Sequence, residues 1–170
     1  MATCLLSACT NTLSYYQDKQ PTLDLQQFLA GKITGVGIIK DWRGRITRQF
    51  EFSGDAQWKK DIGTFTEEMR YVDGRTEHRL WTIKKINHHY YEATTADVIG
   101  VAKIFIQGNA MNWQYRMDVK VDNTTYRLRF DDWMYLVTGN TLLNENKFKK
   151  FGITVGSLVL FMHKNEGAGA

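Results

Sequence analysis

Hydrophobic and polar residues alternate along most of the chain, most regularly between residues 111 and 121. Every odd position from Met111 to Val121 is apolar and every even position is polar, so that Asn112 is expected to face solvent. Only a strand with one buried face explains this pattern, because successive side chains of a strand point to opposite faces. Residues 122–123 are a turn signal and the alternation resumes at Tyr126, which predicts an antiparallel hairpin.

The same alternation recurs from Gly35 to His163, and short turn signals such as Asp73-Gly74 interrupt it. We count about nine or ten predicted strands with no long helical segment between them. Parallel strands need crossover helices, so the sheet should be antiparallel. We therefore predict an all-β fold, an antiparallel up-and-down barrel, with a two-sheet sandwich as the alternative.

The residues before the predicted strands suggest a short helix and a polar connection. Leu25, Phe28 and Leu29 fall on one face of a helix that Gly31 would end, and this helix is expected to pack against an end of the barrel. The expected organisation is a tether over residues 10–22, a single β-barrel domain over 23–165 and a flexible tail over 166–170.

Composition and charge narrow the class of protein. The chain has 170 residues, 43% of them hydrophobic and 24% charged, which suits one globular domain and excludes wholesale disorder. Two cysteines, Cys4 and Cys9, are too few for a disulfide scaffold or a four-cysteine zinc site. The net charge is +4, but basic residues are interleaved with acidic ones, so nucleic acid is not an expected partner.

The sequence Leu6-Ser7-Ala8-Cys9 resembles a bacterial lipobox, in which the cysteine thiol receives a lipid. We therefore expect Cys9 to be the lipidation site and residues 1–9 to be the remnant of a lipoprotein signal peptide. Only eight residues precede Cys9 and none is charged, whereas a signal peptide has a basic start and a longer apolar stretch. Either the natural start lies upstream, or the match is accidental and the protein is cytoplasmic. By similarity to other lipoproteins, Thr10 after the cysteine favours the outer membrane.

Several strings of residues together resemble a family of bacterial lipoproteins known as domain of unknown function 3833. These are Gly35-Val36-Gly37-Ile38, Tyr71-Val72-Asp73-Gly74, residues 96–100, residues 108–113, Phe130-Asp131-Asp132-Trp133-Met134-Tyr135, Lys150-Phe151-Gly152 and Val155-Gly156. The resemblance covers roughly residues 25 to 163 in the same order. It implies a lipocalin-like (calycin-like) barrel in a periplasmic, lipid-anchored protein. It supplies no catalytic residues, because the family has no settled activity.

Residues that could support metal binding or nucleophilic catalysis are scattered. His88 and His89 are adjacent, so on a strand they would point to opposite faces. Ser157 lacks the surrounding glycine pattern of a nucleophile elbow. We therefore expect no metal, no cofactor and no catalytic residue of these classes.

Asp132 belongs to the one polar cluster with possible chemistry. If the alternation continues from Tyr126, Asp132 points inward and Asp131 outward. A buried carboxylate must be paired, or its pKa rises. Asp132 could then orient a ligand head group or act as an acid; alternatively it forms a salt bridge to an arginine such as Arg79, with Trp133 closing a barrel end. The same alternatives apply to Asp97, Glu67 and Asn112.

The leading hypothesis is an outer-membrane lipoprotein whose barrel binds a small hydrophobic or lipid-like ligand. The alternatives are that the interior side chains simply pack, that the protein is an envelope enzyme with a pocket at Asp132, and that it is a non-catalytic envelope scaffold. The residues expected to line or fill the interior are Phe50, Phe52, Trp81, Trp113, Tyr115, Met117, Leu128, Phe130, Asp132 and Trp133.

Overall fold

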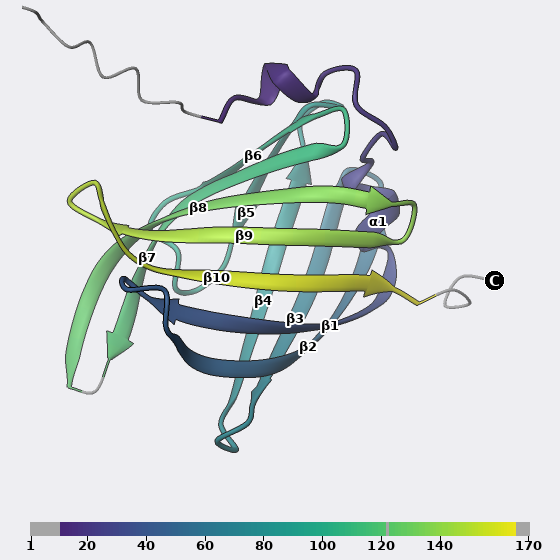
Figure 1. Ribbon diagram of the computed structural model, residues 1–170. Coiled ribbons are helices and arrows are strands. Elements are labelled where there is room, and N and C mark those ends of the chain that lie inside the picture. Colours follow the sequence, from purple (N-terminus) through teal and green to yellow (C-terminus); the bar gives the residue numbers. More distant parts are fainter. Residues whose placement is uncertain (1–10, 122, 166–170) are drawn as a thin grey trace, which may run out of the picture.

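Ten antiparallel strands form a closed barrel in a computed structural model that describes residues 11–121 and 123–165 (Figure 1). Each strand pairs with the next along the chain, and the last pairs with the first. The strands are β1 (Gly31–Asp41), β2 (Ile46–Lys59), β3 (Ile62–Tyr71), β4 (Thr76–Lys85), β5 (Tyr90–Thr94), β6 (Ala102–Gln107), β7 (Ala110–Val121), β8 (Thr124–Thr138), β9 (Thr141–Lys150) and β10 (Ile153–Lys164).

The barrel closes through a long ladder between β1 and β10, which runs from Ile33 opposite Lys164 to Asp41 opposite Gly156. This closure confirms the predicted up-and-down barrel and excludes the two-sheet sandwich. It also leaves no unpaired strand edge along this seam, so no row of free backbone donors and acceptors is presented there for pairing with another chain.

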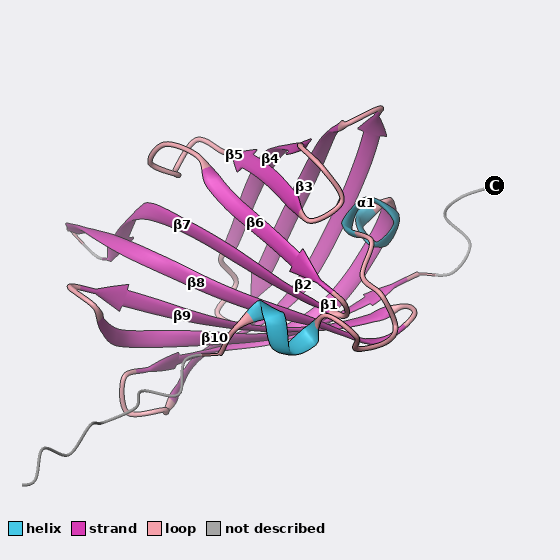
Figure 2. Cartoon of the chain, turned by 90° about the horizontal axis from the view of Figure 1, so that it is seen from above, coloured by secondary structure: helices cyan, strands magenta, loops and turns pink. Residues whose placement is uncertain are grey.

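Successive turns alternate between the two ends of the barrel. The turns after β1, β3, β7 and β9 lie at one end, which we call the hairpin end, and the turns after β2, β4, β6 and β8 lie at the other. The short helix α1 (Leu25–Leu29) lies at this second end, the helix end (Figure 2). The Asp24 side chain caps α1 by accepting a hydrogen bond from the Gln27 backbone N–H at 2.9 Å.

Helix α1 is amphipathic, as the spacing of its apolar residues predicts. Leu25, Phe28 and Leu29 are all buried, with exposed fractions of 5% or less, and they face the barrel interior. The other described helical turn, η1 (Leu13–Tyr16), is a 3-10 turn with no buried residue. No helix among the described residues is long and apolar enough to cross a membrane.

Part of the predicted tether lies against the outer surface of the barrel. The Tyr16 ring packs against Trp133 and Tyr135, with ring centroids 6.1 and 5.5 Å away, and Asn11 Nδ2 donates to the Tyr135 hydroxyl at 3.0 Å. Gly108 allows this close approach, since a Cβ there would overlap the Tyr16 carbonyl oxygen. The expectations for residues 1–9 and 166–170 lie outside the described residues.

The burial of Asn112 differs from the prediction. This residue has the outward register of a polar position, yet it is only 3% exposed. Its Nδ2 donates to Asp131 Oδ1 at 3.0 Å and to the Asp132 carbonyl oxygen at 3.1 Å. The expectation that Asn112 faces solvent is therefore wrong, because alternation predicts the face of a strand but not what covers that face.

Candidate functional site

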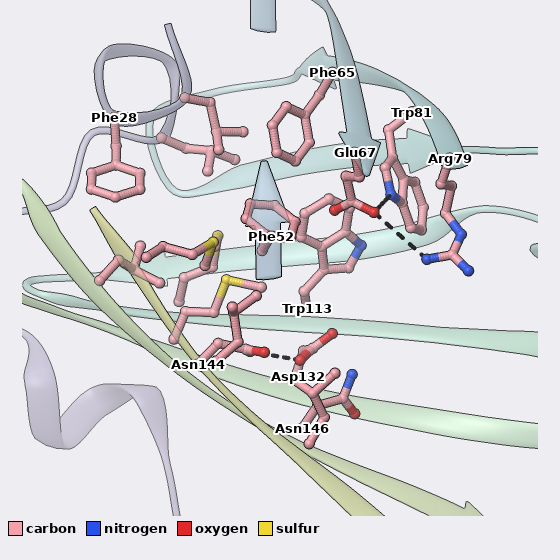
Figure 3. A pocket seen from close by; sticks show the side chains of 18 of the residues that line it. Phe28, Phe52, Phe65, Glu67, Arg79, Trp81, Trp113, Asp132, Asn144 and Asn146 are labelled. Carbon is pink, nitrogen blue, oxygen red and sulfur yellow. Dashed lines mark hydrogen bonds and ion pairs between the residues drawn. The ribbon is translucent and has the colours of Figure 1, made fainter. Parts of the chain in front are cut away.

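The barrel interior holds a cavity of about 90 Å³, lined by side chains from α1 and from the strands (Figure 3). Its lining divides by chemistry. The apolar side chains include Leu25 and Phe28 from α1, together with Met69, Met111, Met134, Leu142 and Met162 from the strands. The polar side chains are Glu67, Arg79, Tyr115, Asp132, Asn144 and Asn146.

Asp132 is the centre of the first polar group. It lies on β8 with its side chain inside the barrel and is 5% exposed, as the alternation predicts. Asn144 Nδ2 donates to its Oδ1 at 2.7 Å, and the Tyr115 hydroxyl donates to its Oδ2 at 3.2 Å. Burial raises the pKa of Asp132 to about 7, although both hydrogen bonds act in the opposite direction. Burial also raises the pKa of Tyr115, so its hydroxyl stays protonated and can donate.

The second polar group joins the cavity to the surface. Glu67 Oε2 accepts from Trp81 Nε1 at 3.1 Å and lies 3.6 Å from Arg79 Nη1. Arg79 Nε lies 3.5 Å from Asp97 Oδ2 in the loop after β5. Burial raises the pKa of Glu67, and the positive charge of Arg79 opposes this shift. The proposed salt bridge between Asp132 and Arg79 is therefore wrong, because Arg79 is paired with Glu67 and Asp97.

The loop of residues 95–101 fills part of the barrel wall. β5 and β6 have only five and six residues, so near the hairpin end they do not extend between β4 and β7. The loop crosses this region through a bridge between Val98 and Met117 and a 2.9 Å hydrogen bond from the Ile99 N–H to the Arg116 carbonyl. Arg79 on β4 thus contacts both the cavity and this loop.

Two buried polar atoms of the cavity lining have neither a hydrogen-bond partner nor an ion-pair partner within the part of the chain that the structure describes. One is Trp113 Nε1, a donor, and the other is Asn146 Oδ1, an acceptor. Arg79 Nε also lacks a hydrogen bond but lies 3.5 Å from Asp97 Oδ2. The side chains of Trp113 and Asn146 are 4% and 5% exposed. An unsatisfied buried polar atom destabilises a fold by about 1–3 kcal/mol, so both atoms are suited to a polar group from a bound molecule.

The structure brings half of the expected interior residues to the cavity. Phe52, Trp81, Trp113, Tyr115 and Asp132 line it. The others lie elsewhere, and their positions form three groups. Phe50, Met117 and Phe130 are buried but do not line the cavity, Leu128 is partly exposed, and Trp133 is on the outer face of β8 beside Tyr16.

Sequence reasoning missed Asn144 and Asn146, which supply the amide groups of the cavity. Both lie at inward positions of β9, between Leu142 and Phe148. The sequence did contain a sign of them: the otherwise apolar inward face of this strand has amide side chains at two successive inward positions. A buried amide needs hydrogen-bond partners, so this interruption marks a polar interior.

Candidate metal ligands do not gather in the described ranges, 11–121 and 123–165. No group of three or more His, Cys, Asp or Glu side chains there could hold a metal ion. Cys4 and Cys9 lie outside these ranges.

Solved structures with a similar fold have very different sequences. The S-type phycobiliprotein lyase CPES from Guillardia theta matches with a TM-score of 0.58 and 7% identity, over 85% of this chain and 94% of that one. A protein of unknown function from the DUF3598 family of Nostoc punctiforme matches with a TM-score of 0.59 and 12% identity, over 93% of this chain and 53% of that one. At such identities the likeness shows the fold alone, a lipocalin-like barrel.

Sequence comparison gives the family. No curated protein matches the chain. Residues 3–164 match the family described as "Protein of unknown function (DUF3833)", which confirms the resemblance drawn from the short strings of residues. The chain therefore belongs to the DUF3833 family.

Proposed function

We propose that the barrel binds a small amphiphilic, lipid-like molecule. The observation that carries this proposal is the cavity with one apolar and one polar side, in which Trp113 Nε1 and Asn146 Oδ1 lack partners among the described residues. Sites for small molecules have this composition, mostly apolar with a few convergent polar groups.

The size of the cavity limits what enters without rearrangement. About 90 Å³ is less than the roughly 300–1,000 Å³ of typical ligand sites. Four methionines line it, namely Met69, Met111, Met134 and Met162. Methionine is unbranched and has three rotatable side-chain bonds, so these residues can move to admit an acyl chain. We infer that the apolar part of the ligand lies toward α1, where most of them are.

The polar group of the ligand follows from the two unpartnered atoms. Trp113 Nε1 needs an acceptor and Asn146 Oδ1 needs a donor. A hydroxyl group supplies both. A carboxylate cannot donate, and above about pH 7 it would also be repelled by the ionised Asp132. We therefore propose an uncharged, hydroxyl-bearing head group.

Calorimetric titration of the full chain with octan-1-ol tests this proposal. We expect octan-1-ol to bind at about pH 8, and octanoate to bind much more weakly. Trp113→Phe keeps an aromatic ring but removes the Nε1 donor, so octan-1-ol affinity should fall about fivefold to tenfold, the value of one hydrogen bond.

Trp133→Phe is the matched control, because it makes the same change on the outer face of the barrel. It should leave octan-1-ol affinity unchanged. The proposal is wrong if octan-1-ol does not bind, if octylamine binds more tightly than octan-1-ol, or if Trp113→Phe binds as well as the unmodified protein.

We also propose that the protein is an outer-membrane lipoprotein acylated at Cys9. The lipobox-like Leu6-Ser7-Ala8-Cys9 and the following Thr10 support this. When the gene is expressed from its own start in its natural bacterium, an alkyne-tagged palmitate should label the protein, and the label should appear in the outer-membrane fraction. Cys9→Ser should abolish labelling, whereas Cys4→Ser should not. Equal labelling of both variants would disprove the assignment of Cys9.

Acid–base catalysis at Asp132 is a second candidate function. A carboxyl whose pKa is about 7 can both accept and release a proton near neutral pH, and the Tyr115 hydroxyl lies 3.2 Å from it. Asp132→Asn tests this second function. If the protein is an enzyme, the variant should stay folded but lose turnover of a lipid-derived substrate. If it only binds its ligand, the variant should still bind octan-1-ol.

A further inference from the structure

The turn between β9 and β10 carries an unusual phenylalanine. Phe151 and Gly152 form this two-residue turn, and their φ angles are +50° and +83°. Two-residue hairpin turns of this kind favour Asn, Asp or Gly, because positive φ brings a Cβ close to the backbone. Phe151 is nevertheless 94% exposed, so packing within the described structure does not compensate for the strained backbone. Such an outlier points to a functional role.

The neighbouring turn, between β1 and β2, also carries an exposed aromatic side chain. Trp42 is 68% exposed, and the Arg43 guanidinium lies 4.6 Å from the centroid of its ring. β1 and β10 are adjacent strands, with Asp41 opposite Gly156, so the two turns are neighbours at the hairpin end (Figure 1). Ile46 and Ile153, at the first residues of β2 and β10, are 53% and 70% exposed.

The charges around these apolar residues are mainly positive. Lys150 lies 5.6 Å from the Phe151 ring centroid and 4.5 Å from that of Tyr126. Asp41 is the acidic residue of the β1–β2 turn, and its charge is offset by Arg45 at 2.8 Å. Arg43 and Lys150 therefore remain beside Trp42 and Phe151 as basic groups. We call this set, Trp42, Arg43, Ile46, Lys150, Phe151 and Ile153, the tip patch.

We propose that the tip patch binds the surface of a membrane that contains anionic lipids. Aromatic rings with neighbouring cations suit the interface of a bilayer, where the ring enters the head-group region and the cation meets lipid phosphate. The shape favours a bilayer over a protein partner. The apolar side chains lie in two narrow turns and at the first strand residues beside them, and such tips can insert between lipid head groups but offer little flat area for a protein interface.

Vesicle sedimentation of the full chain tests this, with Cys9→Ser introduced so that no lipid can be attached at that residue. We expect binding to vesicles of equal parts phosphatidylglycerol and phosphatidylcholine, and little binding to phosphatidylcholine alone. Phe151→Asn should weaken binding about tenfold through the lost apolar burial. Arg43→Gln combined with Lys150→Gln should weaken it by about 25-fold, since each of the two cations near an anionic surface contributes about fivefold.

Two controls separate binding from folding. Phe151→Asn puts a residue that tolerates positive φ into the turn, so its melting temperature should equal or exceed that of the parent protein. Phe161→Asn makes the same change on the barrel wall, where Phe161 is 46% exposed on β10, and should leave vesicle binding unchanged. The proposal is overturned if the parent protein does not sediment with anionic vesicles, or if Phe161→Asn weakens binding as much as Phe151→Asn. Octan-1-ol binding should be the same in both variants, so this test is independent of the cavity.

Discussion

Replacing Asp132 with asparagine is expected to raise the free energy of unfolding at about pH 8 by roughly 4 kcal/mol. The folded protein holds the pKa of this carboxyl at about 7, against an ordinary value of 3.8. Above pH 7 the folded barrel therefore carries a buried negative charge that the unfolded chain solvates freely. Asparagine removes the charge and still accepts the hydrogen bond from Asn144 at Oδ1.

The pH dependence follows from the direction of the shift. Between about pH 4 and pH 7 the folded state holds a proton on Asp132 that the unfolded state has lost, so stability should fall as pH rises through this range and level off above it. Carboxyls with lowered pKa values, such as Asp41 and Asp118, lose their contribution only at more acidic pH. Urea unfolding of both proteins between about pH 5 and pH 8 should show the difference growing with pH.

Asp131→Asn is the matched control, because it changes the next residue on the opposite face of β8. Asp131 Oδ2 lies 2.6 Å from Lys149 Nζ, and the pKa of Asp131 is lowered. Its replacement should therefore lower stability at neutral pH. If both variants change stability in the same direction, the account of Asp132 as a buried, destabilising carboxylate is wrong.

Replacing Arg79 with methionine is expected to lower the free energy of unfolding by about 2–4 kcal/mol at about pH 8. Methionine keeps the aliphatic packing but leaves Glu67 without the cation that lies 3.6 Å from it. Both side chains keep 17% exposure, so the loss should stay below that of a fully buried pair. The measurement is urea unfolding of the Arg79→Met protein beside the parent.

A second substitution identifies the cause. Glu67→Gln added to Arg79→Met removes the uncompensated charge, and most of the lost stability should return, giving a large coupling in the double-mutant cycle. Arg127→Met breaks the exposed pair with Asp118, whose side chains are 64% and 40% exposed, and should have a much smaller effect. Equal losses for Arg79→Met and Arg127→Met would contradict the role given to Glu67.

The alternation of residues predicted the barrel because almost every strand has one solvent-exposed face and one buried face. It also placed Asp132 inside and Asp131 outside, since a strand has only these two directions for a side chain. The short turn strings Asp73-Gly74 and Gly108-Asn109 were recognisable because each contains a glycine with positive φ, a conformation that few other residues tolerate.

Which side chains pair with one another could not be predicted from the alternation. Arg79 pairs with Glu67 on the adjacent strand and with Asp97 in a loop, and the register that sets these distances depends on the exact length of every turn. Trp133 was expected to line the interior or to close a barrel end, yet the alternation that places Asp132 inside places Trp133 outside, beside Tyr16. Periodicity was the better guide there, because register determines the face and hydrophobicity does not.

The unequal strand lengths have a consequence for how the barrel fluctuates. β5 and β6 have five and six residues, whereas β8 has fifteen, so the fewest backbone hydrogen bonds hold the wall on the side of β5 and β6. Amide hydrogens there should exchange with solvent before those of β8 and β9. Opening on this side leaves the long ladders intact, so the protein can expose its interior transiently without unfolding.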